Sequence, residues 1–155
     1  MATSTVKLRN KRHFTDPILL STLPHYLPLL FVVNCDRTQR FYLAYSIVVA
    51  LSASLSLIWH GQREPHNWLF WLDYGMAFLW TMLDLFAAVT VCPNETVAIV
   101  GLNVCVCVAH VASDHMAKTG VVTYEWGHCC WHVMSSVKST VVAYVIGCRG
   151  LSFRA

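Results

Sequence analysis

The chain has 155 residues, of which 56% are hydrophobic and only 12% are charged, and its net charge is +3. Soluble domains carry about 25% charged residues, so this composition indicates a protein that lies in a membrane. Four of the eleven basic residues lie within the first twelve positions and no basic stripe follows, which argues against nucleic-acid binding. The seven cysteines lack CxxC spacing, which excludes a zinc finger.

The first half of the chain predicts a basic tail and two membrane spans. Residues 1–16 form the tail, and residues 17–33 are free of charge but contain three prolines, so we expect this first span to be kinked or broken. Residues 41–60 form an uncharged stretch of 20 residues. A crossing helix needs about 20 apolar residues, so this second span is long enough.

The second half predicts three further spans, at residues 68–92, 96–112 and 128–147, followed by a short tail at 148–155. The third span contains Asp73 and Asp84, and the fifth contains Lys138. The predicted fold is therefore an all-α, polytopic membrane bundle of about five transmembrane helices over residues 17–147. Cys35, Cys92 and Cys148 lie at the same end of their spans, where two of them could form a disulfide.

Five crossings bring distant residues to the same side of the membrane. If the N-terminus lies on side A, then His60, Asp73, His128 and His132 all lie near side A. Side A carries six basic residues and side B carries four, so the positive-inside rule predicts a cytoplasmic N-terminus. We expect a multi-pass protein of the endomembrane system (ER or Golgi) or of the plasma membrane.

These side chains have the chemistry of a catalytic zinc site. Ser56 and His60 are four residues apart in "SLIWH", as are His128 and His132 in "HCCWH", so each pair lies on one helical face. Three histidine ligands with an open fourth position are typical of catalytic zinc. Asp73 could then act as general base, and Ser56 could hydrogen-bond the attacking water or a developing oxyanion.

Each residue also has a simpler interpretation. The histidines could contact lipid headgroups at the interface, Asp73 could cap the start of the third span, and Ser56 could mediate a helix contact. His110 and His115 are alternative ligands, His66 is expected to be solvated, and His25 has no predicted role.

Asp84 and Lys138 predict a separate contact. Asp84 lies 11 residues after Asp73, and Lys138 lies 10 residues after His128. At a rise of about 1.5 Å per residue, both charges lie about 15 Å further into the membrane than Asp73 and His128. We therefore expect a buried ion pair between the third and fifth spans.

The order Ser56-x3-His60, then Asp73 in "LDYGMAF", then His128-x3-His132 in "GHCCWHV" resembles the CREST superfamily. That group includes alkaline ceramidases, progestin and adiponectin receptors, GPI-remodelling lipases and myomaker-like proteins. The resemblance implies zinc on the three histidines, with Asp73 and Ser56 beside it, and hydrolysis of an amide or ester bond in a membrane lipid. The family has seven spans, so this chain resembles a shortened member, and a homo-oligomer could supply the missing helices.

Two alternatives to a zinc-dependent hydrolase remain open. The first is a non-catalytic protein in which zinc staples the helices together and the chain has a receptor, scaffold or membrane-remodelling role. The second is a haem-b protein with histidines from two helices as axial ligands. Pairs at i and i+4 suit one metal ion better than the two faces of a haem.

Overall fold

The computed structural model describes residues 12–32 and 40–152, with side chains as far as residue 148. These residues form helices and turns, and there is no strand among them. The all-α prediction is therefore confirmed. In chain order the elements are α1 (Pro17–Thr22), the 3-10 helix η1 (Leu23–Tyr26), α2 (Leu29–Val32), α3 (Arg40–Gly61), α4 (Trp68–Thr90), the 3-10 helix η2 (Pro93–Glu95), α5 (Thr96–Lys118) and α6 (Tyr124–Ser152).

Within the described part of the chain, four helices, α3 to α6, are long and apolar enough to cross a membrane, as expected of a multi-pass membrane protein. Each presents large apolar side chains on its outer surface, where lipid would replace water as the solvent. Examples from the four helices are Ile47, Phe78, Val104 and Val137.

The first predicted span is broken, as its prolines indicated. The apolar stretch Pro17–Val32 is divided into α1, η1 and α2. Pro24 stands at the start of η1 and Pro28 lies just before α2. Proline has no backbone N–H to continue an α-helix, so a single long helix cannot form here.

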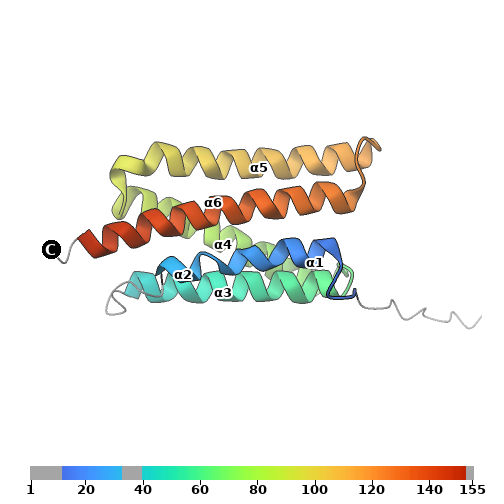
Figure 1. Ribbon diagram of the computed structural model, residues 1–155, viewed down its shortest axis with the longest axis horizontal. Coiled ribbons are helices and arrows are strands. Elements are labelled where there is room, and N and C mark those ends of the chain that lie inside the picture. The colour runs from blue at the N-terminus through green and yellow to red at the C-terminus, as the bar shows by residue number, and fades with distance from the viewer. Residues whose placement is uncertain (1–11, 33–39, 153–155) are drawn as a thin grey trace, which may run out of the picture.

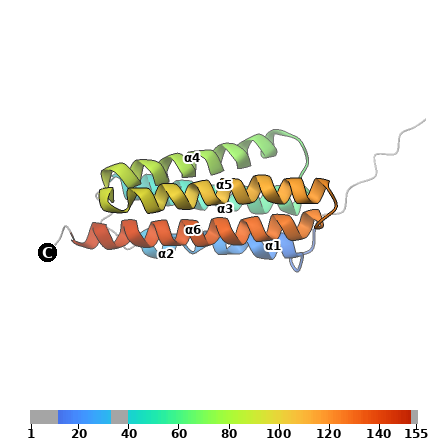
Figure 2. The ribbon, with the colours of Figure 1, turned by 90° about the horizontal axis from the view of Figure 1, so that it is seen from above.

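Five segments form a closed ring: the broken stretch made of α1, η1 and α2, and the four long helices α3 to α6. Helix α3 packs against α4, α4 against α5 and α5 against α6, while α1 and α2 lie between α6 and α3 (Figures 1 and 2). Helices α3 and α6 therefore face the interior from different sides, and side chains from both can meet there.

Gly127 allows a close approach between α5 and α6. A Cβ atom at this position would lie 3.3 Å from both the Cβ and the carbonyl oxygen of Ser113, which is tighter than ordinary contact. The absence of a side chain therefore lets α6 sit directly on α5, one residue before His128. This contact fixes the position of His128 along the axis of α5.

The predicted ion pair forms inside the ring. Nζ of Lys138 lies 2.6 Å from Oδ2 of Asp84, and both side chains are buried. The hydroxyl of Tyr45 donates to Oδ1 of the same carboxylate at 2.7 Å, and Nε1 of Trp80 donates to that hydroxyl at 3.1 Å. The network joins α3, α4 and α6, and it satisfies charges that would be costly alone in a bilayer.

The predicted boundaries change in several places, among them the end of the fourth span, where α5 continues to Lys118 instead of ending at residue 112. Arg12 and Asp16 of the predicted N-terminal tail contact the bundle or α1, since Arg12 N–H donates to the carbonyl of Gly61 at 3.0 Å. Helix α6 begins at Tyr124, four residues before the predicted span, and it extends through Ser152.

Of the cysteines proposed for a disulfide, Cys92 is buried, Cys148 is exposed and Cys35 lies outside the described residues.

Candidate metal centre

The three predicted histidine ligands converge. His60 lies in the last turn of α3, and His128 and His132 lie on one face of α6. Nε2 of His60 is 3.3 Å from Nε2 of His128 and 3.0 Å from Nε2 of His132. All three side chains are buried, and one ligand atom from each lies within 4.8 Å of the others. This group could hold a metal ion.

Glu64 fixes the orientation of the His60 ring. One of its carboxylate oxygens lies 3.0 Å from Nδ1 of His60. Burial raises the pKa of Glu64, but hydrogen bonds from His60 and Tyr124 outweigh that effect, so the pKa lies below its ordinary value. Glu64 is therefore a carboxylate at neutral pH, and it favours a proton on Nδ1. The lone pair of His60 then lies on Nε2, which faces the other two histidines.

The turn after α3 brings Glu64 to this position. Arg63 and Glu64 have φ values of 60° and 57°, in the left-handed region that side chains other than glycine seldom adopt. These two residues reverse the chain immediately after the helix and return the carboxylate toward His60. Nη2 of Arg12 holds the same oxygen from the N-terminal side at 3.2 Å. The strained turn therefore sits directly beside the candidate ligands.

Asp73 and Ser56 lie together next to the histidines. Ser56 and His60 both lie close enough to the Asp73 carboxylate to interact with it electrostatically. Both side chains are buried. Asn67, rather than Asp73, caps α4, because its side-chain oxygen accepts from the N–H of Leu69 at 3.0 Å. The capping interpretation of Asp73 is therefore wrong.

A cavity of about 500 Å³ extends from this group along the bundle and opens toward its outer surface at Phe78 and Val111, which are exposed. Its walls include Ser56, Asp73 and His132, together with the ion-pair residue Lys138. Most of the remaining wall is apolar, with Ala77, Phe78, Trp80, Val106, Val111 and Trp131. The candidate centre is thus at one end of an apolar space that extends along the helices.

Four further histidines, at positions 25, 66, 110 and 115, have three kinds of surroundings. His25, which has no predicted role, is buried with its ring edge-to-face against His132, 5.2 Å between centroids, and its Nδ1 lies 3.1 Å from Oγ of Ser136. His110 packs on Trp131 but is not part of the three-histidine group. His115 and His66 are exposed, in agreement with the solvated position expected for His66.

The donor set fits a zinc ion. Zn–N distances of about 2.0–2.1 Å in a tetrahedral site place ligand nitrogens about 3.3 Å apart, close to the separations of 3.0 and 3.3 Å from His60. Three nitrogens leave one position open. The same separations argue against the haem alternative, because axial nitrogens on opposite sides of one iron lie two metal–nitrogen bonds of about 2.0 Å apart, farther than the nitrogens found here.

The chain matches no protein-family model, no curated protein and no solved structure, so the resemblance to the CREST superfamily rests on its motif residues alone.

Proposed function

We propose that the chain is a zinc-dependent integral-membrane hydrolase that cleaves an amide or ester bond of a lipid. One observation supports this most strongly: three histidine nitrogens converge beside the carboxylate of Asp73 at the end of an apolar cavity. A purely structural metal site is normally closed by four protein ligands. Here three histidines are brought together, and Asp73, a group suited to proton transfer, lies beside them.

The side chains would divide the chemistry between them. When bound, zinc polarises a carbonyl oxygen and allows water to act as a nucleophile at neutral pH. The Asp73 carboxylate accepts the proton of the attacking water and returns it to the departing nitrogen or oxygen. Ser56 lies beside Asp73 and keeps its carboxylate oriented. Glu64 keeps the proton on Nδ1 of His60, so Nε2 stays available as a ligand.

The cavity supports a lipid as the proposed substrate. Its apolar walls would contact an acyl chain, with Phe78, Val106 and Val111 among them. The reacting carbonyl would then lie near His132 and Asp73, which line the same space. Burial of a chain in this cavity removes apolar surface from water at about 25 cal/mol per Å² and would position the bond.

Release of fatty acid tests the proposal. The purified protein, loaded with zinc, is incubated separately with a ceramide and a diacyl phospholipid, and free fatty acid is measured by mass spectrometry. We expect turnover of one class that disappears in His128→Ala and remains in His115→Ala, an exposed histidine outside the group. Turnover that persists in both His60→Ala and His128→Ala would contradict the proposal.

A non-catalytic, zinc-stapled membrane protein with a receptor, scaffold or membrane-remodelling role is the second candidate. The histidines join α3 to α6 across the ring, so a bound ion would fix the two helices relative to each other whether or not it catalyses a reaction. Zinc bound at one ion per chain, with no turnover of any lipid class, would favour this alternative.

The orientation is also a proposal. The excess of basic residues on the N-terminal side supports a cytoplasmic N-terminus, in an endomembrane or in the plasma membrane. Protease accessibility of a tag fused to the N-terminus, in sealed microsomes, tests this. A tag protected until the membrane is permeabilised would place the N-terminus on the opposite side.

A further inference from the structure

A second cavity, of about 310 Å³, lies at the membrane-interface end of the bundle, beside the histidines. It is bounded by the end of α3, the start of α4, the end of α5 and the start of α6, and His128 forms part of its wall. Its size is at the lower end of the range for small-molecule sites, about 300–1,000 Å³. Because these helix ends lie where lipid headgroups meet water, we consider a headgroup as its occupant.

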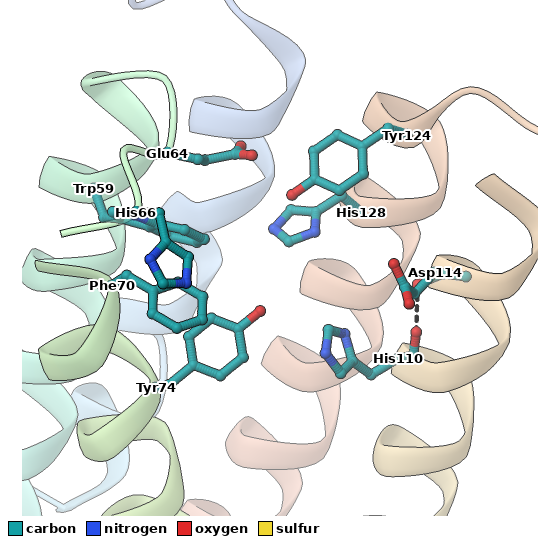
Figure 3. A pocket seen from close by; sticks show the side chains of 10 residues that line it. Trp59, Glu64, His66, Phe70, Tyr74, His110, Asp114, Tyr124 and His128 are labelled. Atoms are coloured by element: carbon teal, nitrogen blue, oxygen red, sulfur yellow. Dashed lines mark hydrogen bonds between the residues drawn. The ribbon is translucent and has the colours of Figure 1, made fainter. Parts of the chain in front are cut away.

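Aromatic rings form opposite walls of this interfacial cavity (Figure 3). Trp59, Phe70 and Tyr74 stand on one side. The rings of Trp59 and Tyr74 are nearly perpendicular, at 81°, with centroids 5.9 Å apart, and Phe70 lies 4.6 Å from Tyr74. Tyr124 stands on the other side, stacked on His128 at 5.0 Å between centroids. His66 also lines the cavity and stacks on Phe70, at 25° and 4.6 Å between centroids, so the rings beside Phe70 form one connected aromatic wall.

The charged side chains of the wall favour a cationic group over an anionic one. Glu64 and Asp114 line the cavity, three histidines (His66, His110 and His128) line it with them, and no lysine or arginine is among its lining residues. Arg12 and Lys118 pair with these carboxylates, but neither forms part of the wall. An anion would therefore meet carboxylates and ring faces, whose quadrupoles are negative. A cation would be attracted by both.

We propose that this interfacial cavity binds the quaternary ammonium group of a lipid headgroup between Trp59, Phe70, Tyr74 and Tyr124. Aromatic enclosures of this kind are a general means of recognising choline-like ligands, because a bulky, weakly hydrated cation interacts favourably with several ring faces. A primary ammonium is more strongly hydrated and would lose more on entering the same space. The inference therefore names a choline-headed lipid as the ligand.

The two cavities are neighbours. Tyr74 and His110 line both of them, and the candidate centre contributes to both, with His128 in the wall of one and His132 in the wall of the other. A lipid with its headgroup in the interfacial cavity and a chain in the apolar cavity has its linking bonds next to the candidate centre. That the bound lipid is also cleaved rests on the proposed function; binding of the headgroup does not.

The test compares headgroups on lipids that cannot be hydrolysed. The full-length protein in detergent is titrated with dialkyl ether lipids that differ only in carrying phosphocholine, phosphoethanolamine or phosphoglycerol, and binding is measured by native mass spectrometry. We expect the phosphocholine lipid to bind at least about tenfold more tightly than the phosphoglycerol lipid, the gain of roughly two cation–π contacts. Equal binding of the three lipids would overturn the inference.

Substitutions of the aromatic wall residues test whether these rings bind the headgroup. Phe70→Leu and Tyr74→Leu should each weaken phosphocholine binding by about three- to thirty-fold, whereas Phe70→Tyr and Tyr74→Phe, which keep a ring, should retain it. Trp126→Leu removes an exposed interfacial aromatic outside the cavity and should leave the affinity unchanged. Loss of affinity in Trp126→Leu equal to that in Tyr74→Leu would indicate nonspecific membrane contact and overturn the inference.

Competition with soluble ligands shows whether the bound cation belongs to a lipid headgroup or to free choline. A turnover measurement distinguishes failure of this inference from failure of the proposed function. Competition by free choline or phosphocholine against the ether lipid supports the cavity as the site. If free choline binds while the lipids show no headgroup preference, a lipid is not the ligand and the inference is wrong. Headgroup preference without turnover of the corresponding ester lipid would leave this inference in place and remove the hydrolase proposal.

Discussion

Nδ1 of His60 lies 3.0 Å from the Glu64 carboxylate, although helix α3 has ended between the two residues. Two consecutive residues in the left-handed region, Arg63 and Glu64, close this contact. Carboxylates in this position hold a metal-binding histidine in one tautomer and increase its basicity. The turn between α3 and α4 is therefore part of the candidate metal centre.

Glu64→Gln tests this role. The amide oxygen accepts a hydrogen bond from Nδ1 but lacks the charge of the carboxylate, so we expect zinc affinity to fall by about 10- to 100-fold. Affinity is measured by competition with a chromogenic chelator. Glu125→Gln, which removes an exposed acidic residue in the first turn of α6, is the control and should bind zinc like the parent protein. Equal affinities for both variants would remove Glu64 from the centre.

Metal content tests the histidine group directly. Purified protein should contain about one zinc ion per chain by elemental analysis, since three ligands converge on a single position. His128→Ala removes one ligand and should leave little zinc after dialysis, whereas His115→Ala should retain the full amount. Equal zinc in both variants would show that the metal binds elsewhere.

Asp73→Asn separates catalysis from metal binding. Asparagine keeps the shape of the side chain and a partner for Ser56, but it cannot accept a proton from water. We expect lipid turnover to fall by about 10²- to 10⁴-fold while the zinc content stays unchanged. Fatty-acid release and elemental analysis of the same preparation provide the two readouts. If zinc is lost together with activity, Asp73 supports the metal site instead of moving a proton.

The Asp84–Lys138 pair predicts strong coupling between two substitutions. Lys138→Met leaves a buried carboxylate without its cation, and Asp84→Asn leaves a buried ammonium, so each should destabilise the protein by about 3–5 kcal/mol. The double variant removes both charges and should lose less than the sum, with a coupling energy of about 0.5–3 kcal/mol. Thermal unfolding in detergent measures all four proteins. Additive losses would show that the two charges do not stabilise each other.

Much of this arrangement follows from spacing and topology in the sequence. His60, His128 and His132 were expected on one side of the membrane because the connecting spans have fixed directions, and they do converge. The depth of Asp84 and Lys138 follows from the rise per residue of two helices that start at the same side. The break in the first span follows from proline chemistry. These features depend on helical geometry alone, which the sequence pattern determines.

The remaining features depend on backbone and packing details that no periodicity encodes. The contact of Glu64 requires two positive φ values in non-glycine residues, which the sequence does not indicate. The position of His25 against His132 depends on how the broken first segment packs on α6. Ser56 lies beside Asp73, because α3 and α4 pack together and bring the two side chains close. The interfacial cavity needs side chains from four helices, so it exists only after they assemble.

The buried ion pair also has a consequence for how the chain is made. Asp84 and Lys138 are 54 positions apart, so α4 is synthesised well before its cation exists. An unpaired aspartate at the centre of a helix costs about 2.5–3.5 kcal/mol during insertion from the translocon. Helix α4 is therefore expected to stay beside the insertion machinery until α6 emerges. Synthesis of α6 then determines when α4 enters the lipid.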